Sequence, residues 1–237
     1  MRIFFAGDCH FEPKPDPERL SRFLMFLNEI DEGDTLVLLG DIFDFWFEYP
    51  DMIQAGHFPI LCAFKELSER AEIFYIPGNH DIWAGRLLES FGPKVRKGGV
   101  MFDLGGNRLI AVHGDMIGRR NSLGRLILGN PFLTWMYSLI HPALGVPLAS
   151  WVSKLSRVKS GRLELPPEVT AWMLKEMTED IRCLVAGHFH TPFLRKVNDK
   201  VLACAGDWLS AFTYIVLEGE FLSLVGFGKE KIEEVKI

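Results

Sequence analysis

Five short apolar stretches of this chain each end beside glycine and a cluster of polar residues, and this pattern constrains the fold more than any other feature. The clusters read GDCH at 7–10, GDIFD at 40–44, GNHD at 78–81, HGD at 113–115 and GHFH at 187–190. Short apolar runs between turn signals are typical of buried strands. Because ligand sites of open α/β sheets form beyond the carboxyl ends of strands, we expect the clusters to meet there.

Two helical patterns separate the first three strands. Residues 17–30 and 58–71 have apolar side chains at every third or fourth position, which is typical of amphipathic helices. The alternation of strands and helices predicts an α/β fold. Strand-like stretches then follow the last polar cluster, where we expect antiparallel strands, at 201–208, 212–219 and 221–228.

The composition favours one globular domain. The 237 residues are 48% hydrophobic, enough for a sizeable core, and we predict a single domain over 1–237. The four cysteines are scattered without a CxxC pair, which argues against a disulfide framework or a zinc knuckle and fits a reducing compartment. The apolar run at the N-terminus is too short for a signal peptide. We therefore expect a cytoplasmic protein.

The polar clusters have the donors of a metal site. A lone histidine after a strand is usually structural, but five of the seven histidines fall in these clusters: His10, His80, His113, His188 and His190. Aspartate, asparagine and histidine without cysteine suit Mn²⁺, Fe²⁺ or Zn²⁺. Alternate residues of an extended segment point the same way. We therefore expect Asp8 and His10 to reach one metal ion.

The ordered set D-x-H, G-D, G-N-H-D, H-G-D and G-H-x-H resembles the calcineurin-like metallophosphoesterase superfamily. The resemblance implies a four-layer α-β-β-α sandwich that holds two divalent metal ions. Carried over by motif position, one ion would take Asp8, His10, Asp41 and His190. The other would take Asp41, Asn79, His113 and His188, with Asp41 as the bridge.

The resemblance also implies a mechanism. Two cations about 3.5–4 Å apart acidify a shared water, and the resulting hydroxide attacks phosphorus in line with the leaving oxygen. His80 would contact the phosphate or protonate the leaving group. Asp81 would orient His80, as carboxylates orient imidazoles elsewhere, or would only support its loop. Cys9, between two ligands, is expected to pack in the core.

Longer stretches narrow the family. LGDIFDFWFEY, PGNHDIW, HGDMIG, GHFHTP and GDWLSAFTYIVLEG are similar to the UDP-2,3-diacylglucosamine pyrophosphohydrolases of lipid A biosynthesis. The resemblance implies cleavage of the substrate to UMP and 2,3-diacylglucosamine 1-phosphate, with Mn²⁺ as the usual metal. It also implies an inserted helical cap that holds the acyl chains, here at about 117–165. The best-known branch differs in having arginine at His80 and an acidic residue near Asn121.

The inserted segment contains a long stretch without charge, Leu126–Ser153. A single membrane crossing would separate His113 from His188, which both belong to one metal centre. The prolines of the uncharged stretch would also interrupt a continuous helix. We therefore expect two helices, near Phe132–Ile140 and Val146–Val158, with turns at His141–Pro142 and at Gly145.

The insert differs in charge from the rest of the chain. Residues 116–163 have seven basic and no acidic side chains, which leaves 19 basic against 31 acidic residues elsewhere. On charge alone this fits an anionic, amphiphilic partner and a helical subdomain with a solvated basic face equally well. Together with the resemblance it implies an amphiphilic nucleotide-lipid substrate and contact with the inner membrane surface. The acidic remainder argues against nucleic-acid binding. The candidate substrate contacts, some of which could instead be packing residues, are Asn79, Trp46, Trp83, Asn121, Lys154, Arg157 and Lys159.

Two other functions remain open. The chain could be a phosphodiesterase or nucleotide pyrophosphatase that acts on a soluble substrate. It could also be a binding scaffold that has lost catalysis, although all the motif ligands are present. The oligomeric state is not predicted.

Overall fold

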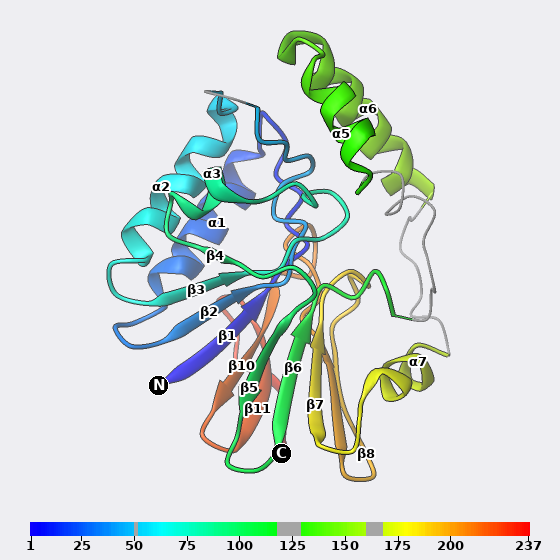
Figure 1. Cartoon of the computed structure of the whole chain (residues 1–237). Coiled ribbons are helices and arrows are strands. Elements are labelled where there is room, and N and C mark those ends of the chain that lie inside the picture. Colours follow the sequence, from blue (N-terminus) through cyan, green and yellow to red (C-terminus); the bar gives the residue numbers. More distant parts are fainter. Residues whose placement is uncertain (50–51, 118–128, 160–167) are drawn as a thin grey trace.

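The computed structural model describes residues 1–49, 52–117, 129–159 and 168–237, except for the side chains of 154–159, and contains two β-sheets (Figure 1). The first sheet has the strand order β12 (Lys231–Lys236), β11 (Phe221–Gly226), β10 (Thr213–Glu218), β1 (Arg2–Ala6), β2 (Thr35–Leu38), β3 (Glu72–Tyr75) and β4 (Lys94–Val95). The second has the order β5 (Val100–Asp103), β6 (Arg108–Val112), β7 (Ile181–Ala186), β9 (Lys200–Cys204) and β8 (Phe193–Val197).

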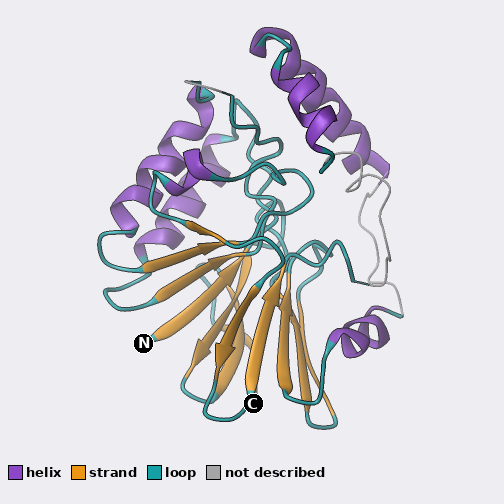
Figure 2. Ribbon diagram, in the orientation of Figure 1, coloured by secondary structure: helices purple, strands orange, loops and turns teal. Residues whose placement is uncertain are grey.

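Helices flank the two sheets on opposite sides (Figure 2). The first sheet is covered by α1 (Pro17–Asn28), α2 (Phe58–Leu67), the short 3₁₀-helix η1 (Ala55–His57) and α3 (Arg86–Glu89). The second sheet carries α7 (Val169–Glu176). Two more helices, α5 (Pro131–Ser138) and α6 (Pro142–Lys159), stand beyond the ends of the strands.

Three hydrophobic cores separate these layers. Along β1 the side chains alternate, so that Ile3 and Phe5 pack between the sheets while Phe4 packs under α1 and α2. On the far side, Met173 of α7 packs against Leu202 of β9. The predicted four-layer α-β-β-α sandwich is therefore confirmed.

Parallel pairing brings the strand ends together. In the first sheet β1, β2 and β3 are parallel, and in the second β6, β7 and β9 are parallel. The loops that follow their carboxyl ends gather between the sheets, below α5 and α6 (Figure 1). The predicted final strands β10 and β11 are antiparallel, as expected, and the unpredicted β12 extends them antiparallel, whereas β9 lies in the other sheet, parallel to β7 and antiparallel to β8.

The helices of the insert begin and end differently from the prediction. Asn130 caps α5 by accepting hydrogen bonds from the backbone N–H groups of Phe132 and Leu133. The predicted turn at Gly145 is wrong, because α6 continues through Gly145 and Pro147. A Cβ at Gly145 would lie 2.2 Å from the Tyr49 hydroxyl, so glycine is needed for close packing there.

None of the helices described is both long and apolar enough to span a membrane. The predicted limits of the insert, 117–165, stay a prediction because residues 118–128 and 160–167 lie outside the described part of the chain.

Candidate metal centre

Five of the predicted ligands share an unusual backbone conformation. Asp8, His10, Asp41, His188 and His190 all have left-handed φ angles, between 46° and 64°. Such a conformation costs non-glycine residues about 1–3 kcal/mol each and is concentrated at functional sites. The ligands therefore do not alternate along extended strands, as the sequence analysis assumed. Sharp turns after the strands bring them together instead.

The first donor group joins the ends of β1 and β7. Asp8, His10 and His190 have donor atoms within 4.8 Å of one another. The Nε2 atoms of His10 and His190 lie 3.4 Å apart, and the Asp8 Oδ1 atom lies 3.7 Å from the latter. The other oxygen of Asp8 accepts a hydrogen bond of 2.7 Å from the backbone N–H of His188. This hydrogen bond ties the two loops of the sandwich together.

The second donor group contains Asp41, His113 and His188. The Nε2 atom of His113 lies 3.5 Å from Asp41 Oδ2 and 3.3 Å from Asn79 Oδ1. Its Nδ1 atom lies 2.6 Å from the Leu39 carbonyl, which orients the ring and leaves Nε2 for a ligand. The structure thus brings all seven predicted metal ligands into two adjoining groups.

Asp41 touches both groups. Its Oδ2 atom lies 3.9 Å from His10 Nε2 as well as 3.5 Å from His113 Nε2. Its Oδ1 atom accepts a hydrogen bond of 2.9 Å from the backbone N–H of His80. A Cβ at Gly78 would lie 2.2 Å from that oxygen, so this glycine gives Asp41 its space. The position agrees with the bridging role that the resemblance implies.

The electrostatics of the site fit divalent cations. Burial raises the pKa of Asp8 well above its usual value and also raises that of Asp41, while burial lowers the pKa of His188 to about 4. Buried carboxylates are costly to ionise unless a positive charge compensates them. Asp8 Oδ1 is buried and accepts no hydrogen bond from the described residues. Neutral imidazoles and ionised carboxylates together are the ligand forms that bind metal ions.

The comparisons with known proteins agree with this site. Residues 1–192 match the calcineurin-like phosphoesterase family. The chain belongs to the calcineurin-like phosphoesterase family. It is thus a metal-dependent phosphoesterase, as predicted.

Curated relatives extend over nearly the whole phosphoesterase. A UDP-2,3-diacylglucosamine hydrolase of Porphyromonas gingivalis is 27% identical over 252 residues, covering 94% of this chain and 96% of its own. A protein of the same name from Vibrio cholerae is 25% identical, covering 91% and 94%. Among solved structures, the E. coli phosphoesterase Yfce has a TM-score of 0.55 at 16% identity, with all of both chains covered. The latter shows the fold alone.

His80 and Asp81 of the phosphoesterase have different surroundings. The Nδ1 atom of His80 lies 2.9 Å from the Asp44 carbonyl oxygen. Asp81 is buried and accepts hydrogen bonds from the backbone N–H groups of Gly78 and Ile42 and from the Tyr75 hydroxyl. None of these partners is the His80 ring. These contacts fit the expected loop-supporting role of Asp81, and the other expected role, orienting His80, stays a prediction.

The sequence analysis missed two carboxylates beside the site. Asp44 has its Oδ1 atom 3.9 Å from His80 Nδ1 and 4.0 Å from His10 Nδ1. Asp207 has its Oδ2 atom 3.5 Å from His190 Nδ1. Burial acts to lower the pKa of His190, but its hydrogen bond with Asp207 and the charge of Asp8 raise it overall. The sequence did contain a signal for both residues, because Asp44 ends the motif GDIFD and Asp207 is the aspartate of GDW.

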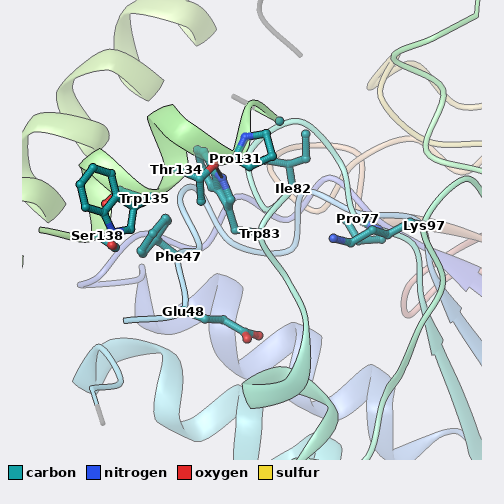
Figure 3. Close-up of a pocket in the computed structure, with 11 residues that line it drawn as sticks. Phe47, Glu48, Pro77, Ile82, Trp83, Lys97, Pro131, Thr134, Trp135 and Ser138 are labelled. Atoms are coloured by element: carbon teal, nitrogen blue, oxygen red, sulfur yellow. Dashed lines mark hydrogen bonds between the residues drawn. The ribbon is translucent and has the colours of Figure 1, made fainter. Parts of the chain in front are cut away.

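A cavity of about 750 Å³ lies beside the G-N-H-D loop (Figure 3). Trp83 lines it and donates a hydrogen bond of 3.2 Å to Thr134 of α5. Trp135 stands at one end of the cavity and Lys97 at the other (Figure 3). Cys9 packs in the core, as predicted. Trp46 is also in the core, where it is 3% exposed and stacks on Phe43. Its position does not favour the predicted substrate contact.

The remaining predicted substrate contacts are only partly visible. Lys154, Arg157 and Lys159 lie on α6, but their side chains are outside the described part of the structure. Asn121 falls in the undescribed residues 118–128. These four residues stay predictions.

Proposed function

We propose that this phosphoesterase hydrolyses the pyrophosphate bond of UDP-2,3-diacylglucosamine, to give UMP and 2,3-diacylglucosamine 1-phosphate. The observation that carries the proposal is the pair of adjoining donor groups between which Asp41 lies, in a chain whose curated relatives with that hydrolase name match over more than 90% of both lengths. The reaction adds one water. Its oxygen bonds to phosphorus, the anhydride P–O bond breaks, and the leaving phosphate takes up a proton.

The two donor groups would each hold a divalent ion, most simply Mn²⁺, with Fe²⁺ or Zn²⁺ as alternatives. When bound, such ions acidify water and neutralise charge on phosphate oxygens. The left-handed loops set the donor atoms in place before substrate arrives. His80, whose ring has a nitrogen within 4.8 Å of donor atoms of His10 and Asp41, would contact the phosphate or give a proton to the leaving oxygen.

The insert supports an amphiphilic substrate. Large apolar side chains of α5, α6 and the turn between them are exposed to solvent, with exposed fractions of 42–69%: Phe132, Leu133, Trp135, Met136, Leu139, Leu144, Leu148, Trp151 and Val152. Exposed apolar surface of this extent is characteristic of sites that bind ligands, proteins or membranes. We propose that the cavity takes acyl chains. We also propose that the exposed surface rests on the cytoplasmic face of the membrane, where the substrate is embedded.

A direct assay tests the proposal. Purified protein loaded with Mn²⁺ is incubated with UDP-2,3-diacylglucosamine in detergent, and UMP release is followed by mass spectrometry. UDP-N-acetylglucosamine, which lacks long acyl chains, serves as the control substrate. Release from the lipid substrate alone is the expected result. Equal or faster cleavage of the soluble nucleotide, or no cleavage of either, would contradict it.

One observation favours a second candidate, a phosphodiesterase or nucleotide pyrophosphatase with a soluble substrate. The chain has His80 where the best-known lipid A branch has arginine, and the histidine form also occurs in the wider superfamily. Faster turnover of small diesters than of the diacyl nucleotide would favour this candidate.

A further inference from the structure

A serine of the insert reaches into the metal centre. Ser153 of α6 is 7% exposed, and its Oγ atom lies 2.7 Å from Asp44 Oδ1 and 3.0 Å from the Asp44 carbonyl oxygen. The same atom lies 2.9 Å from Nδ1 of His80. We propose that Ser153 is a positioning residue that holds His80 in one orientation and couples the docking of the insert to phosphoester hydrolysis. This rests on the catalytic role of His80 in the proposed function.

The hydrogen-bond donors and acceptors determine how the three groups pair. The Asp44 carbonyl can only accept, so the Nδ1 atom that lies 2.9 Å from it carries the hydrogen. Ser153 has a single hydroxyl hydrogen, and the short contact to the Asp44 carboxylate takes it. The serine oxygen is then left as an acceptor beside the His80 Nδ1–H. His80 is fixed by two acceptors through Nδ1, and Nε2 takes no part in this network.

The network connects catalysis to the insert because its parts come from distant segments. Ser153 and Asp44 are 109 residues apart in the sequence. The same insert is attached to the core through a cluster in which Tyr137 and Val146 pack against Phe47 and Tyr49. Residues of α5 also line the cavity beside the G-N-H-D loop. An apolar chain in that cavity holds the insert in place, and Ser153 transmits this position to His80.

A double-mutant cycle tests the proposal. The enzyme variants are Ser153→Ala, His80→Ala and the combination, and the matched control is Ser150→Ala, one turn earlier on α6. Bis(p-nitrophenyl) phosphate and UDP-2,3-diacylglucosamine are the two substrates. We expect Ser153→Ala to lower kcat roughly 10- to 100-fold with KM nearly unchanged, since misplacing a reacting group costs about this much. Ser150→Ala should retain wild-type kcat and metal content.

The decisive comparison is made in the absence of the histidine. If Ser153 acts through His80, adding Ser153→Ala to His80→Ala changes kcat by less than about twofold. The variant Ser153→Thr, which keeps the hydroxyl, should recover most of the lost kcat. An equal loss from Ser153→Ala with and without His80, or a loss accompanied by lower metal content, would overturn the proposal.

The two substrates separate this inference from the proposed function. The small diester reports on the phosphoester centre whatever the natural substrate is. If the protein cleaves the diester but not the diacyl nucleotide, the proposed substrate is wrong and the cycle still decides the role of Ser153. If the diester cycle is additive while the diacyl nucleotide is cleaved, the positioning role is wrong and the proposed substrate stands.

Discussion

Replacing Asp41 should disturb the metal centre more than replacing any other ligand, because Asp41 lies between the two donor groups. We expect Asp41→Ala to lower kcat/KM about 1,000-fold or more, since a metal ion supplies several kcal/mol of charge stabilisation to phosphoryl transfer. Metal content measured by atomic emission should fall in parallel. The exposed Glu32→Ala variant is the control and should retain both. Near-normal activity in Asp41→Ala would rule out the dinuclear mechanism.

His57, which is not among the predicted metal ligands, gives a separate prediction about pH. The residue is fully buried beside Phe43 and Trp46, and burial lowers its pKa to about 4. The unfolded chain binds a proton near pH 6.5 that the folded chain binds only near pH 4. This contribution to stability is therefore complete above pH 6.5 and is lost as the pH falls towards 4, by about 3 kcal/mol.

The variant His57→Phe removes that proton uptake and keeps an aromatic ring. Its unfolding free energy, measured by urea denaturation at equal metal loading, should fall less than that of the wild type between pH 6.5 and 4. If the unfolding free energies of the two proteins fall by the same amount between pH 6.5 and 4, His57 does not cause the loss of stability at low pH.

The sequence predicted the metal ligands better than it predicted the residues that orient the side chains of the site. All the motif ligands meet in the structure because each follows the carboxyl end of a parallel strand. The partners of His80 could not be read from the pattern. Ser153 comes from a helix 109 residues further along the chain than Asp44. Asp44 lies in the motif GDIFD, in which only the first aspartate, Asp41, was interpreted as functional. The orientation of the Asp81 side chain depends on the backbone conformation of its loop, which the spacing of residues in the motif does not determine.

Among the elements, Gly145 on α6 is a sensitive position. Alanine there would favour the helix by about 1 kcal/mol, but its Cβ would lie 2.2 Å from the Tyr49 hydroxyl. Overpacking costs about 1–3 kcal/mol, so we expect Gly145→Ala to loosen the insert. Limited proteolysis should cut the insert faster in this variant, and kcat on the diacyl nucleotide should fall.

A second substitution makes that test specific. Tyr49→Phe removes the oxygen that the new methyl group would meet, so Tyr49→Phe with Gly145→Ala should partly restore protease resistance. Leu144→Ala, at an exposed neighbouring position, should keep the protease resistance of the wild type. If Tyr49→Phe brings no recovery, a different contact limits this position.

The elements that the sequence predicted well are those with strong periodicity. All eight predicted strands and the helices α1 and α2 are present. The strands β4, β5, β8 and β12 and the short helices α3 and α7 were not predicted. β4 has only two residues, and β12 is largely exposed with four charged residues among its six, so neither has a distinct apolar pattern. Their pairing is determined by the sheet beside them.

At the scale of the whole molecule, the exposed apolar surface of α5 and α6 predicts binding to lipid vesicles. Trp151→Glu removes a side chain that is 61% exposed and adds negative charge. Burying such a side chain contributes about 1.5–3 kcal/mol, so vesicle affinity in a sedimentation assay should fall about tenfold or more. Thermal stability should not change, because the residue is exposed.

An equally exposed apolar residue elsewhere supplies the control. Ile232 of β12 is 56% exposed and lies at the far edge of the first sheet. Ile232→Glu should leave vesicle binding unchanged. Equal weakening by both substitutions, or no vesicle binding by the wild type, would contradict a specific membrane surface on the insert.

The position of β1 has a consequence for biosynthesis. The strand that leads into Asp8 and His10 is flanked by β2 on one side and by β10, from near the other end of the chain, on the other. A nascent chain on the ribosome therefore presents the first two ligands long before the strand that completes their sheet, and before His188 and His190, have been translated. The metal centre is assembled only after His188, His190 and β10 have been translated. Until then the cell must keep an open strand edge and unpaired ligands from capturing the wrong partners.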